Sequence, residues 1–554
     1  KNYFNRKLKH AIVPIILNKK TPFPRLRDSG TYLAIEMIEV NKEKHRLALI
    51  EVPTEFPRFH RMKEPGKEYV ILLDDIIRLN LSSVFSIFSF DQVEAYTFKF
   101  SRDAELEIDD DISISFIDKI RRSVTKRNVG IPIRFVYDER MPRRLLDYLL
   151  QGLSLKDGVN TIPGGKYHNF KDFMSFPNFA RSEFNFSKRK ASSHPRLLDP
   201  RSLIKEISKG DILLHYPYQR FDHVVDLLRE AAIDPKVKSI KINVYRVAKK
   251  SQVMNALINA VSNGKQVFVV IEIQARFDEE NNMYWANNLR DAGAKVSYGM
   301  ENLKVHSKLI QIHRVGSKKE QLITYVGTGN FHEKTANMYE DLGLLTVDDR
   351  IGKEVARLFG ILDGYKNDHR FEHLFVAPYN MRSAIEKLIE TEIDNAQNGL
   401  SASIKLKLNN LVDATIIAHL YKASQAGVKL ELLVRGICCV VPGIAGLSEN
   451  ITIRSIVGRY LEHSRYMIFN NNGVPKYYIA SADLMERNLD KRIEVGCPVY
   501  DEALQTQLSR IFEMQWKGNV KSRIIDENQS NIYFQEGEVF YDSQKELHEH
   551  YKLS

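Results

Sequence analysis

Apolar and polar positions alternate in two ways along this chain. Up to about residue 192, strand-like stretches at 32–40, 46–52 and 95–100 accompany a helix-like stretch at 141–153. Beyond it, strand-like and helix-like stretches follow one another in turn, at 212–216, 221–232, 239–246, 253–262 and 267–274. Regular alternation of this kind is typical of a parallel or mixed sheet covered by helices.

The strand–helix pattern of this second region returns from about residue 374. The segment Ser239-Ile240-Lys241-Ile242 corresponds to Ser403-Ile404-Lys405-Leu406, and Gly264 corresponds to Gly427. Correspondence over roughly a hundred residues indicates an internal duplication, and two copies favour a pseudo-twofold pair of domains over a solenoid.

The pattern therefore predicts an α/β and α+β multidomain protein. We expect an α+β head domain at residues 1–192, followed by two duplicated α/β domains with mixed sheets at 193–373 and 374–554. A polar, basic stretch at 181–195 lies at the first boundary. It is interpreted as an exposed connector, with direct phosphate contact as the alternative.

Composition narrows the class of protein. With 43% hydrophobic and 27% charged residues among 554, the chain is globular rather than disordered. Lys plus Arg exceed Asp plus Glu by 81 to 70, a net charge of +11. This excess favours polyanionic partners such as nucleotides, polyphosphate, nucleic acid or anionic lipid, and charge alone does not choose among them.

The cysteine content and the length of the apolar runs indicate where in the cell the protein is located. Only three cysteines are present and two are adjacent, which argues against a disulfide framework or a four-ligand zinc site and favours the cytoplasm. The apolar runs at 11–17 and 267–273 are too short for a spanning helix of about 20 residues. Peripheral attachment to a membrane stays open. Because residue 1 is a lysine within folded-type sequence, we expect a further segment upstream.

One histidine in each copy carries the candidate chemistry. His306 lies in Val305-His306-Ser307-Lys308 and His463 lies in Glu462-His463-Ser464-Arg465. Each copy thus supplies an imidazole and a permanent cation, Lys308 or Arg465, to one site built from two halves. Such a set suits a phosphoryl group under in-line attack, in which nitrogen attacks and cations hold the oxygens. Strand alternation over 305–312 puts His306 and Lys308 on one face.

A small, polar turn follows each histidine segment. In the first copy it is Gly327-Thr328-Gly329-Asn330, and in the second it contains Ser481. Backbone N–H groups and the hydroxyl of such a turn either receive phosphate or orient the imidazole. The order of histidine, cation and turn, occurring twice, makes Thr328, Asn330 and Ser481 supporting candidates.

These segments resemble the phospholipase D superfamily, whose motif reads His-x-Lys-x4-Asp followed by Gly-Ser/Thr-x-Asn. The chain departs from it, since His313 and Asn470 stand at the Asp positions and Arg465 replaces the second lysine. With these departures, the chain is similar over nearly its whole length to the polyphosphate kinases of the long, histidine-phosphorylating type. The segments that carry this resemblance are 243–246, 274–280, 327–331, 435–439 and 481–483.

The resemblance implies reversible transfer of the terminal phosphate of ATP to the end of inorganic polyphosphate, through a phosphohistidine. It implies that His306 is the nucleophile and that His463 is its partner, its proton handler and a nucleotide contact. It also implies that Tyr339 and Arg435 bind the nucleotide; on spacing alone, Tyr339 is equally a half-buried core residue.

The resemblance further implies that Arg246 and Arg276 lie in the phosphate and magnesium region. A guanidinium cannot ligate a cation, so both are expected to bind phosphate oxygens near Mg²⁺ that arrives with the nucleotide. Without the resemblance, each is an ordinary surface ion pair. The acidic run 278–280 is interpreted as a helix N-terminus, with magnesium binding as the alternative.

The implied partners are ATP or ADP and inorganic polyphosphate, together with further copies of the chain in a dimer or tetramer, and no nucleic acid. The resemblance also leads us to expect that the family's N-terminal domain is absent from this sequence. Two alternatives remain: a phospholipase D-type phosphodiesterase or nuclease, disfavoured by the lost Asp positions, and a non-catalytic polyanion-binding protein, disfavoured by the two retained histidines.

Overall fold

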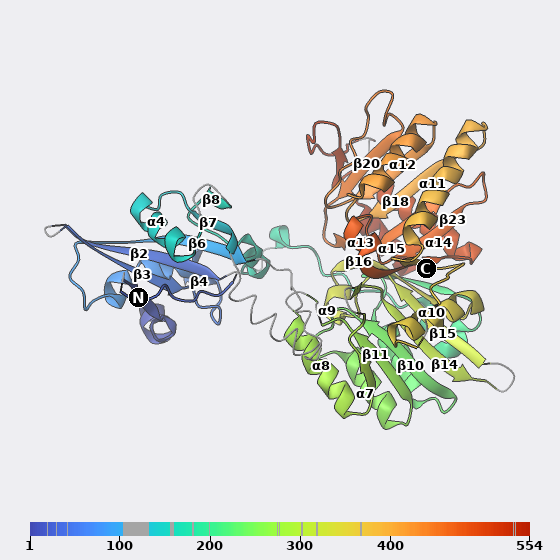
Figure 1. Ribbon diagram of the computed structural model, residues 1–554, viewed down its shortest axis with the longest axis horizontal. Coiled ribbons are helices and arrows are strands. Elements are labelled where there is room, and N and C mark those ends of the chain that lie inside the picture. Colours follow the sequence, from blue (N-terminus) through green and yellow to red (C-terminus); the bar gives the residue numbers. More distant parts are fainter. Residues whose placement is uncertain are drawn as a thin grey trace. The chain divides into compact units, whose positions relative to one another are not determined.

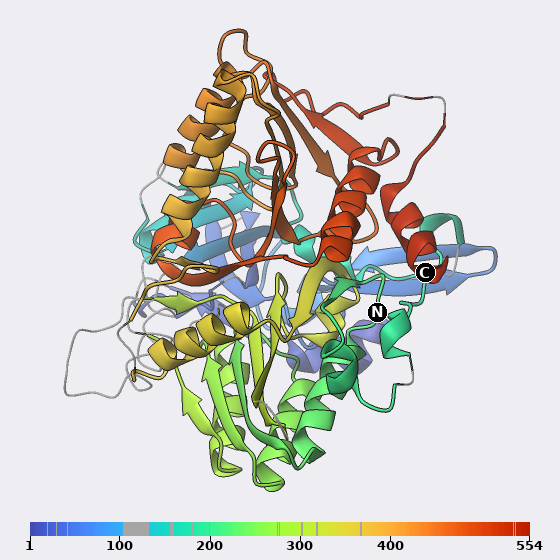
Figure 2. The same cartoon turned by 90° about the vertical axis from the view of Figure 1, so that its right-hand side faces the viewer.

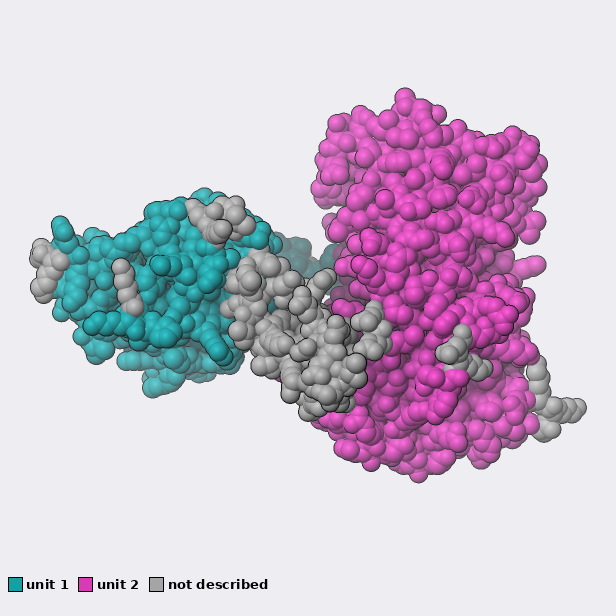
Figure 3. All heavy atoms as spheres, viewed as in Figure 1, with its two compact units in different colours: residues 1–187 teal, residues 188–554 magenta. Residues whose placement is uncertain are grey.

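The structure is a computed structural model and forms two compact units, residues 1–187 and 188–554 (Figure 3). The predicted boundaries of the three domains stay predictions. The structure describes all residues except 19, 29, 41–42, 103–131, 156–159, 180–181, 199, 274, 276–277, 301–302, 317–319, 366–367, 536, 538 and 554.

Unit 1 is built on a six-stranded sheet in the order β1-β3-β2-β6-β7-β8, antiparallel except where β7 meets β8. Alternate residues of β2 face opposite sides: Leu33 and Ile35 join one core cluster, while Tyr32 and Ala34 join the other. Its strands and helices are β1 Pro14–Leu17, β2 Thr31–Glu39, β3 Lys44–Glu51, β4 Phe59–Glu64, β5 Lys67–Leu72, α1 Leu73–Arg78, α2 Leu81–Val84, β6 Gln92–Arg102, β7 Pro132–Asp138, α4 Arg143–Gly152 and β8 Thr161–Gly164. The predicted α+β character is confirmed.

Unit 2 contains two mixed sheets of the same design. The first runs in the order β12-β11-β10-β14-β15-β16, with β9 antiparallel to β16. The second runs in the order β20-β19-β18-β22-β23-β24, with β17 antiparallel to β24. In each, the first three strands are parallel and the remaining pairs antiparallel. The predicted mixed α/β fold is confirmed.

Bounds in the first copy are β9 Ile212–Tyr216, α6 Asp222–Ile233, β10 Val237–Val244, α7 Gln252–Ser262, β11 Gln266–Ile271, α8 Glu279–Asp291, β12 Lys295–Ser297, β13 Lys304–Val305, β14 Leu309–Val315, β15 Glu320–Gly327, α9 Glu333–Ala336, β16 Tyr339–Thr346 and α10 Asp349–Leu362. The short helix α5, Leu203–Ile207, precedes them. Figure 1 shows this copy from green to yellow.

Bounds in the second copy are β17 Phe375–Ala377, α11 Met381–Gln397, β18 Ser403–Leu408, α12 Ala414–Gln425, β19 Lys429–Val434, β20 Ile451–Ile456, β21 Leu461–Glu462, β22 Arg465–Phe469, β23 Lys476–Ala480, α13 Glu486–Asp490, β24 Arg492–Pro498 and α14 Glu502–Trp516. The strand β25, Ser522–Ile525, and the helix α15, Ser543–Leu553, end the chain. Equivalent helices begin in the same way, with a side-chain N-cap: Ser251 caps α7 and Asp413 caps α12.

The two copies exchange one short strand each. Strand β13 of the first copy pairs in parallel with β24 of the second, and β21 of the second pairs in parallel with β16 of the first. Each sheet is thus completed by the other copy. Figure 2 shows the two copies of unit 2 in a second view, the first from green to yellow and the second from orange to red. The exchange brings the residue after each short strand, His306 or His463, to the other copy.

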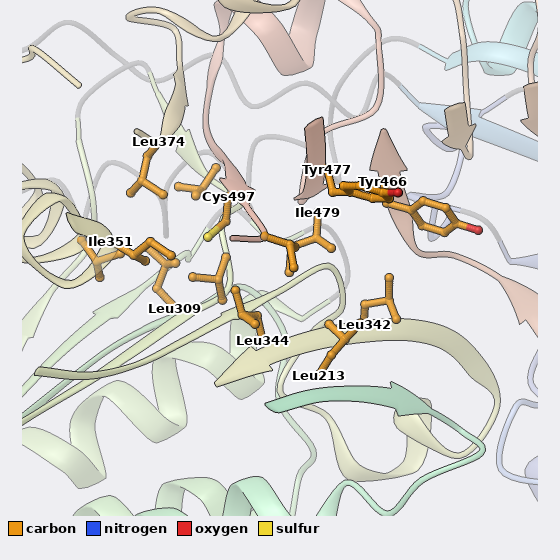
Figure 4. Packing of buried hydrophobic residues seen from close by; sticks show 14 of the residues in the cluster. Leu213, Leu309, Leu342, Leu344, Ile351, Leu374, Tyr466, Tyr477, Ile479 and Cys497 are labelled. Atoms are coloured by element: carbon orange, nitrogen blue, oxygen red, sulfur yellow. The ribbon is translucent and has the colours of Figure 1, made fainter. Parts of the chain in front are cut away.

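A shared core fixes the two copies against each other. Leu309, Leu344 and Ile351 of the first copy pack in one cluster with Ile479 and Cys497 of the second (Figure 4). Burial of so much apolar surface from both copies makes them one body. Within the part of the chain that the structure describes, no helix is long and apolar enough to cross a membrane.

Candidate active site

His306 lies in a break between β13 and β14, so the prediction of one continuous strand over 305–312 is wrong. The N–H groups of His306 and Ser307 both donate to the carbonyl of Ile493, each at 2.9 Å. The buried amide of Asn243 donates to Ser307 O at 2.6 Å and accepts from Leu309 N at 2.7 Å. These bonds replace the regular ladder and turn the histidine toward the second copy.

His463 occupies the same kind of break, between β21 and β22. Its N–H donates to the carbonyl of Glu340 at 3.0 Å, and Arg465 donates from Nη1 to His463 O at 2.8 Å. Both sequence-predicted histidines therefore lie directly after the short strand that pairs with the sheet of the other copy.

A carboxylate from the opposite copy holds each imidazole. Nδ1 of His306 lies 2.8 Å from Glu494 Oε1, and Nδ1 of His463 lies 2.9 Å from Asp341 Oδ2. The two histidine side chains are 13% and 14% exposed, so their rings are held within the protein but remain reachable. A carboxylate at Nδ1 fixes the tautomer and leaves Nε2 as the reactive nitrogen.

Hydroxyl groups of the predicted small turns hold these carboxylates. Thr328 donates from Oγ1 to Asp341 at 2.6 Å, and Ser481 donates to Glu494. Each hydroxyl also accepts a backbone N–H of the carboxylate's strand, at 3.0 Å in both copies. Of the two roles considered for the Thr328 hydroxyl, these contacts favour orientation of the imidazole.

Sequence reasoning missed Asp341 and Glu494. A usable signal was present, because each acid precedes an apolar residue and a glycine at the same point of the repeat, in Asp341-Leu342-Gly343 and Glu494-Val495-Gly496. An acid kept twice inside an otherwise apolar strand is a candidate for orientation of a polar partner.

Burial keeps both imidazoles neutral. It lowers the pKa of His306 to about 3, with help from Lys308 and Arg492 and against the attraction of Glu494. Burial also lowers the pKa of His463, which Asp341 opposes. Burial would raise the pKa of Glu494, but the contact with His306, followed by the nearby Lys308 and Arg492, lowers it to about 2. At neutral pH, His306 is thus a free base held by an ionised carboxylate.

Of the two predicted cations, only Arg465 is permanent. Arg465 is 5% exposed and pairs with Asp483 at 3.2 Å, and its Nη1 lies 3.3 Å from Nε2 of His463. Lys308 is 2% exposed, and burial lowers its pKa to about 7. Lys308 is therefore only partly charged at neutral pH in the free chain, and bound phosphate would favour its charged form.

The residues implied at the nucleotide gather beside His463. The ring of Tyr339 lies 5.1 Å from the imidazole, and it is neither fully buried nor exposed. Arg435 donates from Nε to Asn409 Oδ1 at 2.6 Å and interacts electrostatically with Tyr339 and Arg465. An aromatic ring and two guanidinium groups so placed can hold a base and its phosphates.

On the other side, Tyr245 links Arg246 to His306. The Tyr245 ring meets the imidazole edge to face at 4.8 Å, and Arg246 lies over the same ring at 5.6 Å. Arg246 also pairs with Asp278 at 2.9 Å, the residue before α8. The run 278–280 thus forms the acidic start of that helix, whereas Arg276 lies outside the described residues.

Two further residues were not predicted. Arg492 is 18% exposed in its side chain, lies 3.9 Å from Glu494 and interacts electrostatically with His306 and Lys308. It takes the strand position that Tyr339 takes in the other copy, which the repeat could have revealed. Asn330 of the predicted turn has a buried side-chain oxygen that receives no hydrogen bond from any described residue.

No set of three or more metal-ligating side chains is found within the described ranges. The side chains beside His306 are mainly cationic, and Asp278 is engaged with Arg246. Such a set suits phosphate oxygens rather than a resident divalent cation.

Comparison with known families covers nearly the whole chain. Residues 1–176 match the "Polyphosphate kinase middle domain", residues 202–368 match "Polyphosphate kinase C-terminal domain 1", and residues 374–544 match "Polyphosphate kinase C-terminal domain 2".

Curated relatives and a solved structure agree with these matches. The chain is 44% identical over 544 residues to a polyphosphate kinase of Vibrio parahaemolyticus, covering 97% of this chain and 77% of the relative. It is 41% identical over 545 residues to that of Escherichia coli K12, with 97% and 79% covered. The crystal structure of polyphosphate kinase from Porphyromonas gingivalis superposes with a TM-score of 0.85 at 36% identity, covering 100% of this chain and 82% of that one.

Proposed function

The chain belongs to the polyphosphate kinase family and is an ATP–polyphosphate phosphotransferase, and we propose that His306 carries the phosphoryl group between its substrates as a phosphohistidine. The observation that carries the proposal is the crossed pair of histidines, each held by a carboxylate of the other copy. Membership of this family argues against both alternatives, the phospholipase D-type diesterase and the non-catalytic polyanion-binding protein.

The placement of the nucleotide contacts supports His306 as the nucleophile. In-line displacement puts the attacking atom and the leaving group on opposite sides of phosphorus. Tyr339 and Arg435 lie with His463, so ADP would leave on that side and attack would come from His306. Arg465 and Lys308 interact electrostatically across the copies, which indicates that the two halves form one site.

In the first step, the lone pair of Nε2 of neutral His306 attacks the terminal phosphorus of ATP. The bond from phosphorus to the bridging oxygen breaks, and ADP leaves with its electron pair. The ring keeps its proton on Nδ1 and becomes cationic, which ionised Glu494 stabilises. Arg465 and Arg435 face the charge that develops on ADP.

In the second step, the terminal oxygen of a polyphosphate chain attacks the phosphohistidine, and the P–N bond breaks to restore neutral His306. Neutral His463 is placed to accept a proton from an incoming terminal phosphate. Because a P–N bond retains much of the anhydride's transfer potential, both steps can reverse and yield ATP from polyphosphate.

Kinases generally use a divalent metal, and we infer Mg²⁺ that enters as part of the ATP substrate. Arg246, Lys308 and Arg492 would hold phosphate oxygens, and Arg276 is proposed with them on the resemblance alone. The predicted dimer or tetramer, the absence of nucleic acid, the cytoplasmic location and peripheral membrane attachment stay predictions.

Exchange between labelled ADP and unlabelled ATP, without polyphosphate, tests the covalent route. A phosphoenzyme makes the first step reversible, so the label should enter ATP. His306→Ala should abolish the exchange, and His313→Ala, outside the site, should keep it. Exchange by His306→Ala protein, or none by the parent chain, would contradict the proposal.

A further inference from the structure

A cavity of about 410 Å³ lies wholly within unit 1, away from both histidines in sequence. Its walls come from β6, β7, the end of β8 and the segment that follows β8. The volume lies in the range of sites for small ligands. The lining residues are Lys99, Ser101, Arg134, Val136, Gly164, Gly165, Tyr167, His168, Asn169, Phe170 and Lys171.

Three cations face this cavity, Lys99, Arg134 and Lys171, and none of its described lining residues is acidic. The cations oppose one another: burial lowers the pKa of Lys99, and Lys171 and Arg134 lower it further, against the attraction of Asp172 and Asp28. Like charges brought together at a concave surface are costly unless an anion joins them.

His168 adds a second, independent sign of a ligand. The residue is 9% exposed, and its Nε2 is buried without a hydrogen bond to any described residue. Buried polar atoms normally have a partner, so an orphaned ring nitrogen beside three cations calls for one. Lys99 already donates to Asn169 Oδ1 at 2.8 Å, which holds its ammonium at the cavity wall.

We propose that this cavity is a second phosphate-binding site, which holds a segment of inorganic polyphosphate on unit 1 apart from the transfer site. Three cations match the successive oxygens of a phosphate chain, and Nε2 of His168 can accept from a P–OH group or, once protonated, donate to a phosphate oxygen. The choice of polyphosphate over other phosphates rests on the proposed function, whereas the anion site rests on the cavity alone.

Protection of lysines from acetylation tests the site in the full chain. Lys99 and Lys171 are the reporters, read by mass spectrometry in His306→Ala protein so that no phosphoryl transfer intervenes. The probes are tripolyphosphate, ATP, and sodium chloride at matched ionic strength. Tripolyphosphate should protect both lysines with saturation, and chloride should not.

Two variants sharpen the result. Arg134 is exposed, so Arg134→Gln should leave packing intact and raise the half-protecting concentration of tripolyphosphate about tenfold or more. Lys67→Gln removes an exposed charge elsewhere in unit 1 and should change nothing. Equal protection by chloride, or no effect of Arg134→Gln, would overturn the site.

Protection by ATP but not by tripolyphosphate would overturn the assignment to inorganic chains. Since the background lacks the proposed nucleophile, a failure of the phosphohistidine route would leave these outcomes unchanged. The two proposals therefore fail separately.

Discussion

The two histidine sites share one geometry but are supported by different physics. Behind His306, the exchanged strands pair Val305 with Ile493, and both residues are buried and apolar. Behind His463, they pair Glu462 with Glu340, and both carboxylates are buried around the amine of Lys407, which lies 2.6 Å from Glu340.

The strand position of Lys407 corresponds to that of Asn243, since Leu406 pairs with Met467 as Ile242 pairs with Ile310. The neutral amide of Asn243 therefore supports the strand break at His306, whereas the buried ammonium of Lys407 supports the strand break at His463. His215 and Ser464 complete the charged cluster, because both contact the same carboxylate oxygen of Glu340. The distance to this oxygen is 2.7 Å from Nε2 of His215 and 2.9 Å from Oγ of Ser464.

The difference teaches that duplication preserved the crossed histidine–carboxylate pairs while their surroundings diverged. We infer a division of labour, in which the half with an apolar backing holds the nucleophile and the half with a charged backing handles the nucleotide. A buried ion cluster contributes little net stability but makes the removal of one member costly. The two halves should therefore respond differently to matched substitutions.

Removal of each imidazole should have the largest effect and the clearest asymmetry. His306→Ala should lower transfer by about 10⁶-fold, as loss of a nucleophile does. His463→Ala should slow transfer from the phosphoenzyme to polyphosphate by about 10²–10⁴-fold, as loss of a general base does, and should not abolish labelling of His306. Single-turnover kinetics with labelled ATP measure both; equal and complete loss would break the comparison.

Neutralisation of the carboxylate that holds each imidazole, Glu494 or Asp341, should have the second-largest effect on transfer. Glu494→Gln should slow phosphoenzyme formation by about 10²–10⁴-fold, because the cationic phosphohistidine loses its counter-charge and tautomer control. Asp341→Asn should cost less in this step, since His463 does not become covalently bound. Rapid-quench measurement of the first turnover separates them, and a larger loss for Asp341→Asn would reverse the assignment.

The free energy of unfolding should distinguish the two supporting residues, Lys407 and Asn243. Lys407→Met leaves Glu340 and Glu462 buried without their cation and should lower the free energy of unfolding by about 3–5 kcal/mol. Asn243→Ala should cost about 1–3 kcal/mol. Lys405→Met, on the same strand, removes a half-exposed lysine and should cost less than about 1 kcal/mol. Denaturant titration measures all three; similar losses for Lys407→Met and Lys405→Met would contradict the supporting role of Lys407.

The smallest effect concerns pH. The pKa of Lys308 is about 7 in the free chain, and bound phosphate favours its charged form, so binding takes up a proton above that pH. Affinity for ATP should fall as pH rises through 7, by at most about tenfold per unit. Lys308→Arg should flatten this dependence, and the difference between the two proteins removes the titration of ATP itself. Parallel pH profiles would rule out Lys308 as the cause.

The sequence was sufficient for the duplication, the two histidines and the turns with Thr328 and Ser481, because these lie in local patterns that repeat. It did not reveal the strand exchange or the crossed carboxylates, since His306 and Glu494 are 188 residues apart. Nor did it reveal the pKa of Lys308, which depends on burial by both copies. Local patterns locate such residues, whereas tertiary contacts decide their partners and charge.

The most direct test of the division between the two halves is to locate the covalent phosphate. The protein would be mixed with magnesium and γ-labelled ATP, quenched in alkali, digested and mapped by mass spectrometry, beside His306→Ala and His463→Ala proteins. The account predicts alkali-stable, acid-labile label on His306, in the parent and in His463→Ala, and none in His306→Ala. Label on His463 in the parent chain would contradict it.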